Sequence, residues 1–548
     1  MQTAYDAHGN VIAESGATYP VRYAYDSQGR RVAMNRSGDE WDMTRWTYDP
    51  ATGLCTSKIY EDGSVVTYEY TPDGLLETTR TADVQEVVAA RTAAERARGV
   101  GKRGWIAYEA ERNQYFPAQN LARVKEIAAM LPARAELPGD PIRHRAEWDR
   151  LATTDEGRKL IAKARVALTN AIPALTIEEF RAYQRTGDRS TYGKPMGVRN
   201  QMLTDLLWGE ALENRGAFTD KIAAVLEATC DEPSWVAPFE GGMGDVTKPL
   251  HGVTHYIDLS ASARASLVAT SLSWLRDRLP EKTKEKVLDT LRGRIFETFL
   301  KDARRKGETT PYCNWWMPDR FNWSAVCHNG CTTAILAVED DPTVRAEAVE
   351  ASERLMVPCF LSGFLADGYC EEGMGYWNYG FGNFMRLAAT VRALTDGQVD
   401  FCRDFPKAKT VASFGSRCLM GRGSSPLFAD GNGTPGRDLL ALANMAWPEM
   451  YRAEAKGLSP FFGGFQVFCV RNFGKFRHVV PTDGSAAPLP PRDWFACAGA
   501  LVCRADRLAF AIKGGWKTSE EELRVLVDRV QSGEVQFCPH GRPVKVKL

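Results

Sequence analysis

The sequence predicts a multidomain α+β chain, in which a short β segment, a long helical region and a second β region follow one another. Three observations favour this order: a repeated Tyr-Asp motif over residues 1–80, helical periodicity over residues 113–455, and apolar strands bounded by Gly, Pro and Asp over residues 456–548. Residues 81–112, rich in Ala, Glu and Arg before a Gly-rich break, are expected to form a linker. With 548 residues, the chain exceeds the roughly 250–300 residues at which single cores stop growing.

The first 80 residues repeat a Tyr-Asp motif that is followed by a glycine. Successive tyrosines are separated by 20, 23 and 22 residues, at Tyr5, Tyr25, Tyr48 and Tyr70. Each unit alternates apolar and polar residues around an Asp/Gly turn, which is typical of short β-hairpins. These motifs resemble the YD repeats of the RHS family, whose strands wind into a shell. Because four copies could not close a shell, the resemblance implies a stub or spacer, and a start inside a repeat suggests a fragment of a longer protein.

Two successive segments of the helical region carry apolar residues at helical spacing. The first stripe comprises Leu267, Val268, Leu272, Leu275 and Leu279, and the second comprises Val287, Leu288, Leu291, Ile295, Phe299 and Leu300. Pro280 begins a short break between the two stripes. Repeated helix pairs joined by short loops favour an incomplete (α/α) toroid over a four-helix bundle of this length. The β region that follows is too short to complete a large sandwich, so we expect a partial antiparallel β-sandwich.

The charges of the chain balance, with 69 basic and 69 acidic residues. No overall field therefore recruits nucleic acid or an anionic membrane, although a local basic cleft for an acidic sugar is compatible with this balance. We expect no membrane span, because no run of about 18 apolar residues occurs. The first six residues lack the charged flank and apolar core of a signal peptide.

The 13 cysteines form an odd set without a regular framework. Cys327 and Cys331 are four residues apart and would share one face of a helix. With His328 they could supply half of a zinc site, but no matching second half follows. We therefore expect buried thiols, no metal and no cofactor.

Two segments, residues 320–330 and residues 367–380, crowd amide, phenol, carboxylate and indole groups together at turns between predicted helices. Asn322 in the first and Tyr376 in the second are 54 residues apart. That spacing is about two helical hairpins, enough to return the chain to the same rim of a helical ring. The mixture of groups predicts a cleft that holds a polar polymer and moves a proton next to a carboxylate.

The motifs Asn322-Trp-Ser-Ala-Val-Cys327 and Glu372-Gly-Met-Gly-Tyr-Trp-Asn-Tyr379 resemble those of the heparinase II/III family of polysaccharide lyases. Further matching segments follow the family order over roughly residues 113–515, among them residues 230–236, 255–259 and 508–515. The resemblance implies a toroid with a C-terminal β-sandwich, a uronic-acid polymer such as heparan sulfate or alginate as substrate, and a secreted, periplasmic or cell-surface location. Cleavage in this family proceeds by β-elimination.

The resemblance also implies roles for single residues. An amide must donate hydrogen bonds to the substrate carboxylate as charge develops on it, and Asn322 is the candidate. A tyrosine can remove the proton and protonate the leaving oxygen, with Tyr376 the first candidate and Tyr379 the second. His328 and Glu372 complete the catalytic candidates. Substrate binding is assigned to Trp323, Trp377, Asn378, Tyr379, His255 and Asp430.

Each candidate also has a purely structural interpretation. Asn322 could cap a helix that begins at Trp323, since Asn is a favoured N-cap. Tyr376 and Trp377 could be core aromatics with a polar handle. His328 could hold the structure together through hydrogen bonds.

Glu372, Asp430 and His255 also have structural interpretations. Glu372 could stabilise the first turn of a helix, Asp430 could form a turn, and His255 could pack inside the helical region. Paired carboxylates among Asp367, Glu372 and Asp430 would instead suit a glycoside hydrolase.

One departure from the family pattern concerns histidine. Lys513-Gly-Gly515 is followed by residues 516–527, which contain no histidine where the family carries a His-rich segment. Either the site is incomplete, or His540, His478 or His328 substitutes. A glycan-binding or cell-surface protein that has lost catalysis is therefore an alternative to the lyase.

Overall fold

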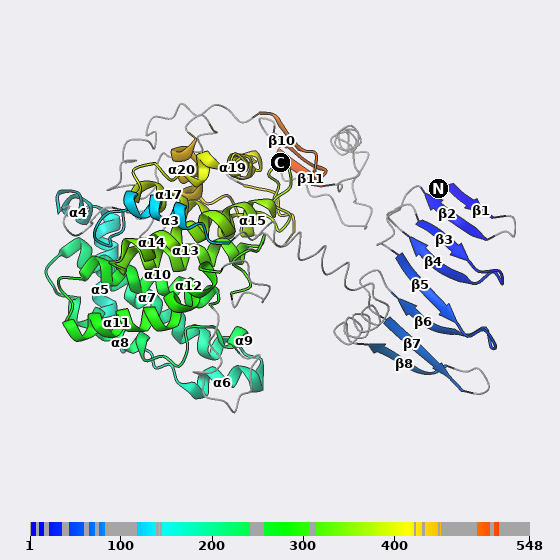
Figure 1. Ribbon diagram of the computed structural model, residues 1–548, viewed down its shortest axis with the longest axis horizontal. Helices are drawn as coiled ribbons and strands as arrows, with labels where there is room; N and C mark the ends of the chain where they lie inside the picture. The colour runs from blue at the N-terminus through cyan, green and yellow to red at the C-terminus, as the bar shows by residue number, and fades with distance from the viewer. Residues whose placement is uncertain are drawn as a thin grey trace. The chain divides into compact units, whose positions relative to one another are not determined.

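The computed structural model describes the chain in two compact units, Met1–Arg112 and Asn113–Leu548, which are taken separately below (Figure 1). The described residues are 2–6, 10–15, 21–35, 43–59, 65–71, 76–82, 118–138, 142, 145–241, 257–305, 314–420, 424–429, 433–447, 450, 490–504 and 509–513. The fold is mixed: an antiparallel sheet forms the first unit, and helices dominate the second.

The first unit is an eight-stranded antiparallel sheet in which each strand pairs with the next along the chain. Its strands are β1 (Gln2–Tyr5), β2 (Val11–Ser15), β3 (Val21–Tyr25), β4 (Arg31–Asn35), β5 (Met43–Tyr48), β6 (Cys55–Ile59), β7 (Val65–Tyr70) and β8 (Leu76–Ala82). Figure 1 draws them as one continuous ladder of hairpins. The prediction of repeated β-hairpins is confirmed.

The Tyr-Asp motif has a structural reason in this sheet. At each of the four repeat tyrosines the strand register shifts, so the tyrosine ends its strand at an irregularity. In the second repeat, the Asp26 carboxylate accepts hydrogen bonds from the backbone N–H groups of Gln28 and Arg30 at 2.9 and 3.0 Å. These bonds lower the pKa of Asp26. Gly29 follows with φ of 75°, a conformation that glycine adopts without strain.

The tyrosine hydroxyls join successive repeats. The Tyr25 hydroxyl donates to the carbonyl oxygen of Val11 at 2.9 Å, and the Tyr48 hydroxyl donates to that of Arg31 at 2.8 Å. Each repeat is therefore tied to the one before it, as expected for a stack of similar units.

The second unit is a helical body. Its helices are α3 (Leu121–Met130), α4 (Arg145–Ala152), α5 (Asp155–Thr169), α6 (Ile177–Thr186), α7 (Ser190–Glu213), α8 (Thr219–Cys230), α9 (Pro238–Gly241), α10 (Leu259–Leu275), α11 (Glu281–Leu291), α12 (Glu297–Ala303), α13 (Asn322–Val338), α14 (Pro342–Ala351), α15 (Val357–Ser362), α16 (Met374–Tyr376), α17 (Gly382–Leu394), α18 (Phe401–Asp404), α19 (Lys407–Arg417) and α20 (Arg437–Ala446), with π-helical turns η2 (Arg292–Phe296), η3 (Ser352–Met356) and η4 (Trp377–Phe381). The helical body is confirmed, while its closure as an incomplete (α/α) toroid stays a prediction.

Helix α13 occupies the centre of this body (Figure 1). It packs against α10 so closely that a Cβ on Gly330 would stand 2.3 Å from the carbonyl oxygen of Ser262. Side chains from α13 enter two hydrophobic clusters, Cys327 and Ala334 the first and Ala325 the second. The body of α13 is buried, and the helix comes near the surface at its two ends, at Phe321 and Trp323 on one side and at Glu339 on the other.

A three-stranded antiparallel sheet follows the helices, in the order β11-β10-β9. Its strands are β9 (Arg492–Phe495), β10 (Ala500–Arg504) and β11 (Ala509–Lys513). Phe495 packs on Tyr369 and Phe414, with ring centroids 5.2 and 5.8 Å away, and so attaches the sheet to the helical body. The described residues contain one sheet here, so the partial β-sandwich also stays a prediction. None of the described helices combines the length and apolar composition needed to cross a membrane.

Candidate functional site

The first turn of α13 is the starting point of the candidate site. Phe321 is the N-cap of this helix, in an extended conformation and without a side-chain capping bond, and Asn322 is the first helical residue. The interpretation of Asn322 as a capping residue is therefore wrong. Its side chain is mostly buried, with 8% exposed, yet within the described part of the chain its carboxamide has no hydrogen-bond partner.

The π-helical turn η4 lies against this end of α13. A Cβ on Gly380 would stand 3.1 Å from the Cβ of Asn322 and 3.2 Å from the ring of Phe360, so glycine is what allows the approach. Two turns further along α13, the Asn329 side chain donates to that of Asn383 at 2.8 Å, and Asn383 donates to the carbonyl oxygen of Tyr379 at 2.8 Å. The two segments that the sequence singled out are thus side by side.

The two candidate tyrosines both reach the surface. Tyr376 ends α16 with 38% of the residue exposed, and Tyr379, within η4, is 41% exposed. Surrounding protein atoms nevertheless desolvate the Tyr379 phenol and raise its pKa to about 12, with smaller contributions from Cys327 and Asp258. Tyr379 therefore keeps its proton and can act only as a donor near neutral pH. Turns of the π type are frequent at functional sites.

His328 lies in the hydrophobic core, whereas a catalytic role requires a side chain that a substrate can reach. It has no exposed surface, and the rings of Phe299 and Trp316 enclose it at 5.5 and 5.4 Å. Nε2 lies 3.2 Å from the carbonyl oxygen of Met317, which can only accept, so this nitrogen carries the proton; Nδ1 lies 3.1 Å from the Ser352 hydroxyl. Burial lowers the pKa of His328 to about 3. The structural interpretation of His328 fits this geometry, and we remove it from the site.

Trp377 also belongs to the core. It is fully buried, its Nε1 donates to the carbonyl oxygen of Val411 at 3.0 Å, and its ring lies 5.7 Å from that of Phe381. A Cβ on Gly415 would collide with its ring. A substrate cannot reach Trp377, so the core interpretation applies to it as well.

Asn378 holds a loop. Its Nδ2 donates to the carbonyl oxygen of Thr434 at 2.8 Å, and its Oδ1 accepts from the backbone N–H of Gly436 at 2.6 Å. Both ends of the carboxamide are engaged, which makes Asn378 a residue that positions residues 433–436 beside η4 rather than a contact for substrate.

The remaining candidates are less well defined. Glu372 is half-buried in the turn before α16. His255 and Asp430 lie outside the described residues, as do His478 and His540. Of the seven histidines, His328 is the one that the described ranges include.

Trp323 is partly buried at the start of α13, next to Asn322. Its ring centroid lies 5.1 Å from that of Trp315, which is 48% exposed, and Phe321 is 52% exposed. Sequence reasoning passed over Trp315 and Phe321, although both come within seven residues of Asn322. Trp315 and Phe321 therefore add exposed aromatic groups close to the first turn of α13.

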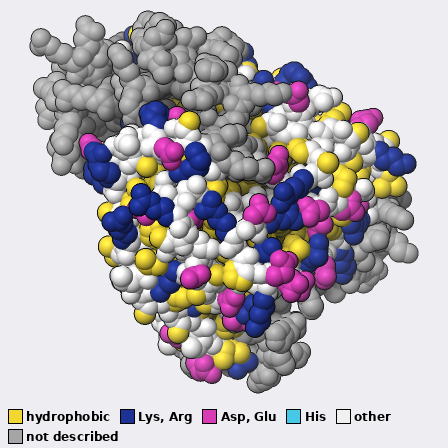
Figure 2. Space-filling view, turned by 90° about the vertical axis from the view of Figure 1, so that its left-hand side faces the viewer, with side chains coloured by type: hydrophobic (Ala, Val, Ile, Leu, Met, Phe, Trp, Pro, Cys, Tyr) yellow, Lys and Arg dark blue, Asp and Glu magenta, His cyan; other side chains and the backbone are white. Residues whose placement is uncertain are grey.

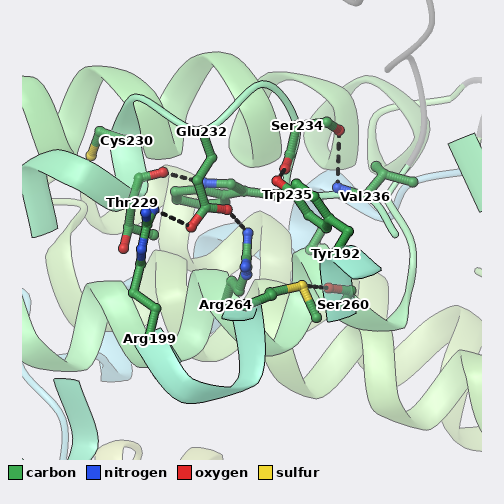
Figure 3. A network of polar contacts seen from close by, with 12 residues as sticks. Tyr192, Arg199, Thr229, Cys230, Glu232, Ser234, Trp235, Val236, Ser260 and Arg264 are labelled. Atoms are coloured by element: carbon green, nitrogen blue, oxygen red, sulfur yellow. Dashed lines mark hydrogen bonds and ion pairs between the residues drawn. The ribbon is translucent and has the colours of Figure 1, made fainter. Parts of the chain in front are cut away.

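Residues 230–236, which the sequence analysis matched to the lyase family, form a buried polar network (Figure 3). The Glu232 carboxylate, with no exposed surface, is bound by Arg199 from α7 at 2.9 Å and by Arg264 from α10. Arg294 of η2 donates to the Glu232 carbonyl oxygen at 2.7 Å. Burial lowers the pKa of Arg264 to about 10 and also lowers those of Arg199 and Arg294. The network joins α7, α10 and η2, so its role is to hold these elements together.

Asp258 connects this network to the candidate site. Its side chain accepts from the backbone N–H of Ala261, which caps α10, at 2.7 Å and from that of Ala237 at 2.8 Å. It also lies near enough to Tyr379 to raise the pKa of that phenol. Asp258 therefore joins the segment around Ala237 to the start of α10.

On the face drawn in Figure 2, Lys and Arg are interspersed with Asp and Glu, so neither sign dominates that face. Cys327 and Cys331 are fully buried, which raises the pKa of both thiols. In the part of the chain that the structure describes, no three His, Cys, Asp or Glu side chains are grouped as metal ligands would be.

Comparison with known proteins concerns the first unit. A family model described as RHS Repeat matches residues 5–40, which agrees with the Tyr-Asp repeats and the antiparallel sheet. No curated protein matches the chain. Residues 5–40 are thus similar to RHS repeats, and the resemblance of residues 113–515 to heparinase II/III enzymes stays a prediction.

Proposed function

We propose that this protein is a polysaccharide lyase that cleaves uronic-acid-containing glycans, of the heparan sulfate or alginate kind, by β-elimination. The observation that carries the proposal is the approach of η4 to α13. It brings an amide without a described hydrogen-bond partner, on Asn322, next to the turn from which Tyr376 and Tyr379 reach the surface.

The proposed reaction uses these groups in turn. The Asn322 amide donates to the uronate carboxylate, and this bond strengthens as negative charge develops there, an effect that can contribute a few kcal/mol. Tyr376, in its phenolate form, removes the proton from the carbon next to the carboxylate and becomes a neutral phenol, which water returns to the phenolate after the reaction. The bond to the glycosidic oxygen then breaks, a carbon–carbon double bond forms, and a phenol returns a proton to the leaving oxygen. Tyr379, whose pKa of about 12 keeps it protonated, suits the last step.

A glycan-binding protein without catalysis is the second candidate. It is supported by His328, the histidine of the described ranges, which is enclosed in the core and unable to face a substrate. A glycoside hydrolase has less support, because the carboxylate of Asp367 already accepts hydrogen bonds from the backbone N–H groups of Tyr369 at 3.2 Å and Cys497 at 2.9 Å.

Ultraviolet absorbance of unsaturated uronides distinguishes the candidates. Incubation with heparan sulfate, alginate and related polymers should raise the absorbance for the wild type and not for Asn322→Ala. Asn170→Ala, at an exposed helix end, is the matched control and should behave as wild type. Folded wild-type protein that leaves every acidic polymer intact would refute the lyase. Binding without turnover would support the glycan-binding protein, and new reducing ends without absorbance would support a hydrolase.

A further inference from the structure

Trp315 is an exposed indole on a firmly held turn. Its neighbour Trp316 is fully buried, donates from Nε1 to the carbonyl oxygen of Ile257 at 2.5 Å, and stacks on Phe299 at 6.3 Å. Two adjacent tryptophans therefore have opposite environments. Burial of Trp316 fixes the turn and directs Trp315 outward, with 48% of the residue exposed.

The residue before this pair strengthens the turn. Asn314, itself fully buried, donates from its backbone N–H and its side chain to Asp302 at 2.7 and 3.0 Å. Its Oδ1 accepts from the backbone N–H of Ile257 at 2.8 Å. A large apolar side chain that is exposed yet rigidly supported loses little conformational entropy when a ligand covers it.

We propose that Trp315, backed by Trp323, is a stacking subsite for one pyranose ring of the glycan. The C–H bonds on one face of a pyranose carry partial positive charge, and they suit the negative face of an indole. The tilt of 39° between the two indoles leaves Trp323 as support behind Trp315 and not as a second parallel platform.

This subsite rests on the proposed function for the identity of its ligand. Trp323 directly follows Asn322 in α13, so the platform borders the amide that would hold the uronate carboxylate. The sugar stacked on Trp315 is then adjacent, along the glycan, to the uronate sugar that loses its proton. Stacking on an indole does not depend on the charge of the sugar, so we expect this subsite to accept a neutral or an acidic sugar.

The test is calorimetric binding of size-defined heparan sulfate and alginate oligosaccharides, with the ultraviolet assay run on the same samples. Trp315→Ala and Trp315→Leu should each weaken binding about tenfold, whereas Trp315→Phe should stay within about threefold of wild type because it keeps an aromatic face. Leu121→Ala, an exposed apolar residue of α3, is the control and should leave binding unchanged.

The outcomes separate the subsite from the lyase. Wild-type affinity in Trp315→Ala, equal affinity of Trp315→Leu and Trp315→Phe, or a wild type that binds none of the oligosaccharides would each overturn the subsite. Binding that depends on Trp315 without any rise in absorbance would keep the subsite and refute the lyase. Turnover by the wild type, with a KM that Trp315→Ala leaves unchanged, would support the lyase and overturn the subsite.

Discussion

Gly380 and Asn322 are in contact across the junction of η4 and α13: a Cβ on residue 380 would stand 3.1 Å from the Cβ of Asn322. These residues are far apart in the sequence and belong to the two segments that carry most of the candidate site. The contact means that any side chain at position 380 must displace either η4 or the first turn of α13. The position of the tyrosines relative to the Asn322 amide therefore depends on this glycine.

Substitution of Gly380 by alanine should lower the free energy of unfolding by about 1–3 kcal/mol, the usual cost of overpacking. The added methyl group would press on Asn322 and on the ring of Phe360, 3.2 Å away. We expect glycan binding and turnover to fall further than this loss of stability alone explains. Urea unfolding and calorimetric binding measure the two effects separately.

Gly293→Ala is the matched control, because a Cβ there would have no atom within 4 Å and the residue sits in another π-helical turn, η2. It should raise stability by up to about 1 kcal/mol, since alanine has less freedom in the unfolded chain. Equal stability of the two variants would show that the contact between η4 and α13 is looser than described.

The order of elements was predictable because it depends on local patterns. The apolar stripes at residues 267–279 and 287–300 correspond to α10 and to the continuous run α11, η2 and α12, and Pro280 is the N-cap of α11. The π-helical turns η2, η3 and η4 were not predicted. Each inserts a residue into a helix without changing the apolar periodicity enough to be noticed.

The site was harder to predict because burial depends on distant partners. His328 and Trp377 are polar or aromatic residues in a promising motif, but their hydrogen-bond acceptors, the carbonyl oxygens of Met317 and Val411, come from other elements. Nothing in the local sequence reports such a partner. Trp315 was missed for the opposite reason: two adjacent tryptophans suggest buried residues, but Trp315 is exposed.

Acid should destabilise the protein through His328. Its pKa is about 3 in the folded state and about 6.5 when unfolded, so the unfolded chain binds one more proton between these values. The stability that neutral His328 provides is complete above pH 6.5 and is lost as the pH falls toward 3. Over this window the free energy of unfolding should drop by up to about 1.4 kcal/mol per pH unit from this group alone.

Comparison with His328→Asn isolates that contribution. The variant is expected to be less stable at neutral pH, because the bonds to Met317 and Ser352 are disturbed. Its free energy of unfolding should nevertheless fall less steeply than that of wild type between pH 6.5 and 4.5 in urea titrations. Parallel slopes would contradict a buried, neutral His328.

Removal of the charge on Glu232 should be among the most damaging single changes. Glu232→Gln would leave Arg199 and Arg264 buried without their carboxylate, and loss of one partner from a buried pair costs about 3–5 kcal/mol. Asp231→Asn, next in the sequence, breaks a 2.7 Å pair with Lys286 in which the Asp231 side chain is 66% exposed, and it should cost less than about 1 kcal/mol. Chemical denaturation of both variants gives the comparison, and similar losses would argue against an ionic network in the core.

Substitution of either candidate tyrosine by phenylalanine should lower activity. If the lyase proposal is correct, Tyr376→Phe and Tyr379→Phe should each lower kcat by about 10² or more, since each removes a proton carrier. Stability should change little, because 38% of Tyr376 and 41% of Tyr379 are exposed. Since the pKa of Tyr379 is about 12, its ionisation should add no alkaline limb to the kcat profile below pH 10. Initial rates of unsaturated uronide formation between pH 5 and 10 measure this profile. A wild-type decline above pH 8 that disappears in Tyr379→Phe would show that this phenol ionises early, and the acid role would then have to be withdrawn.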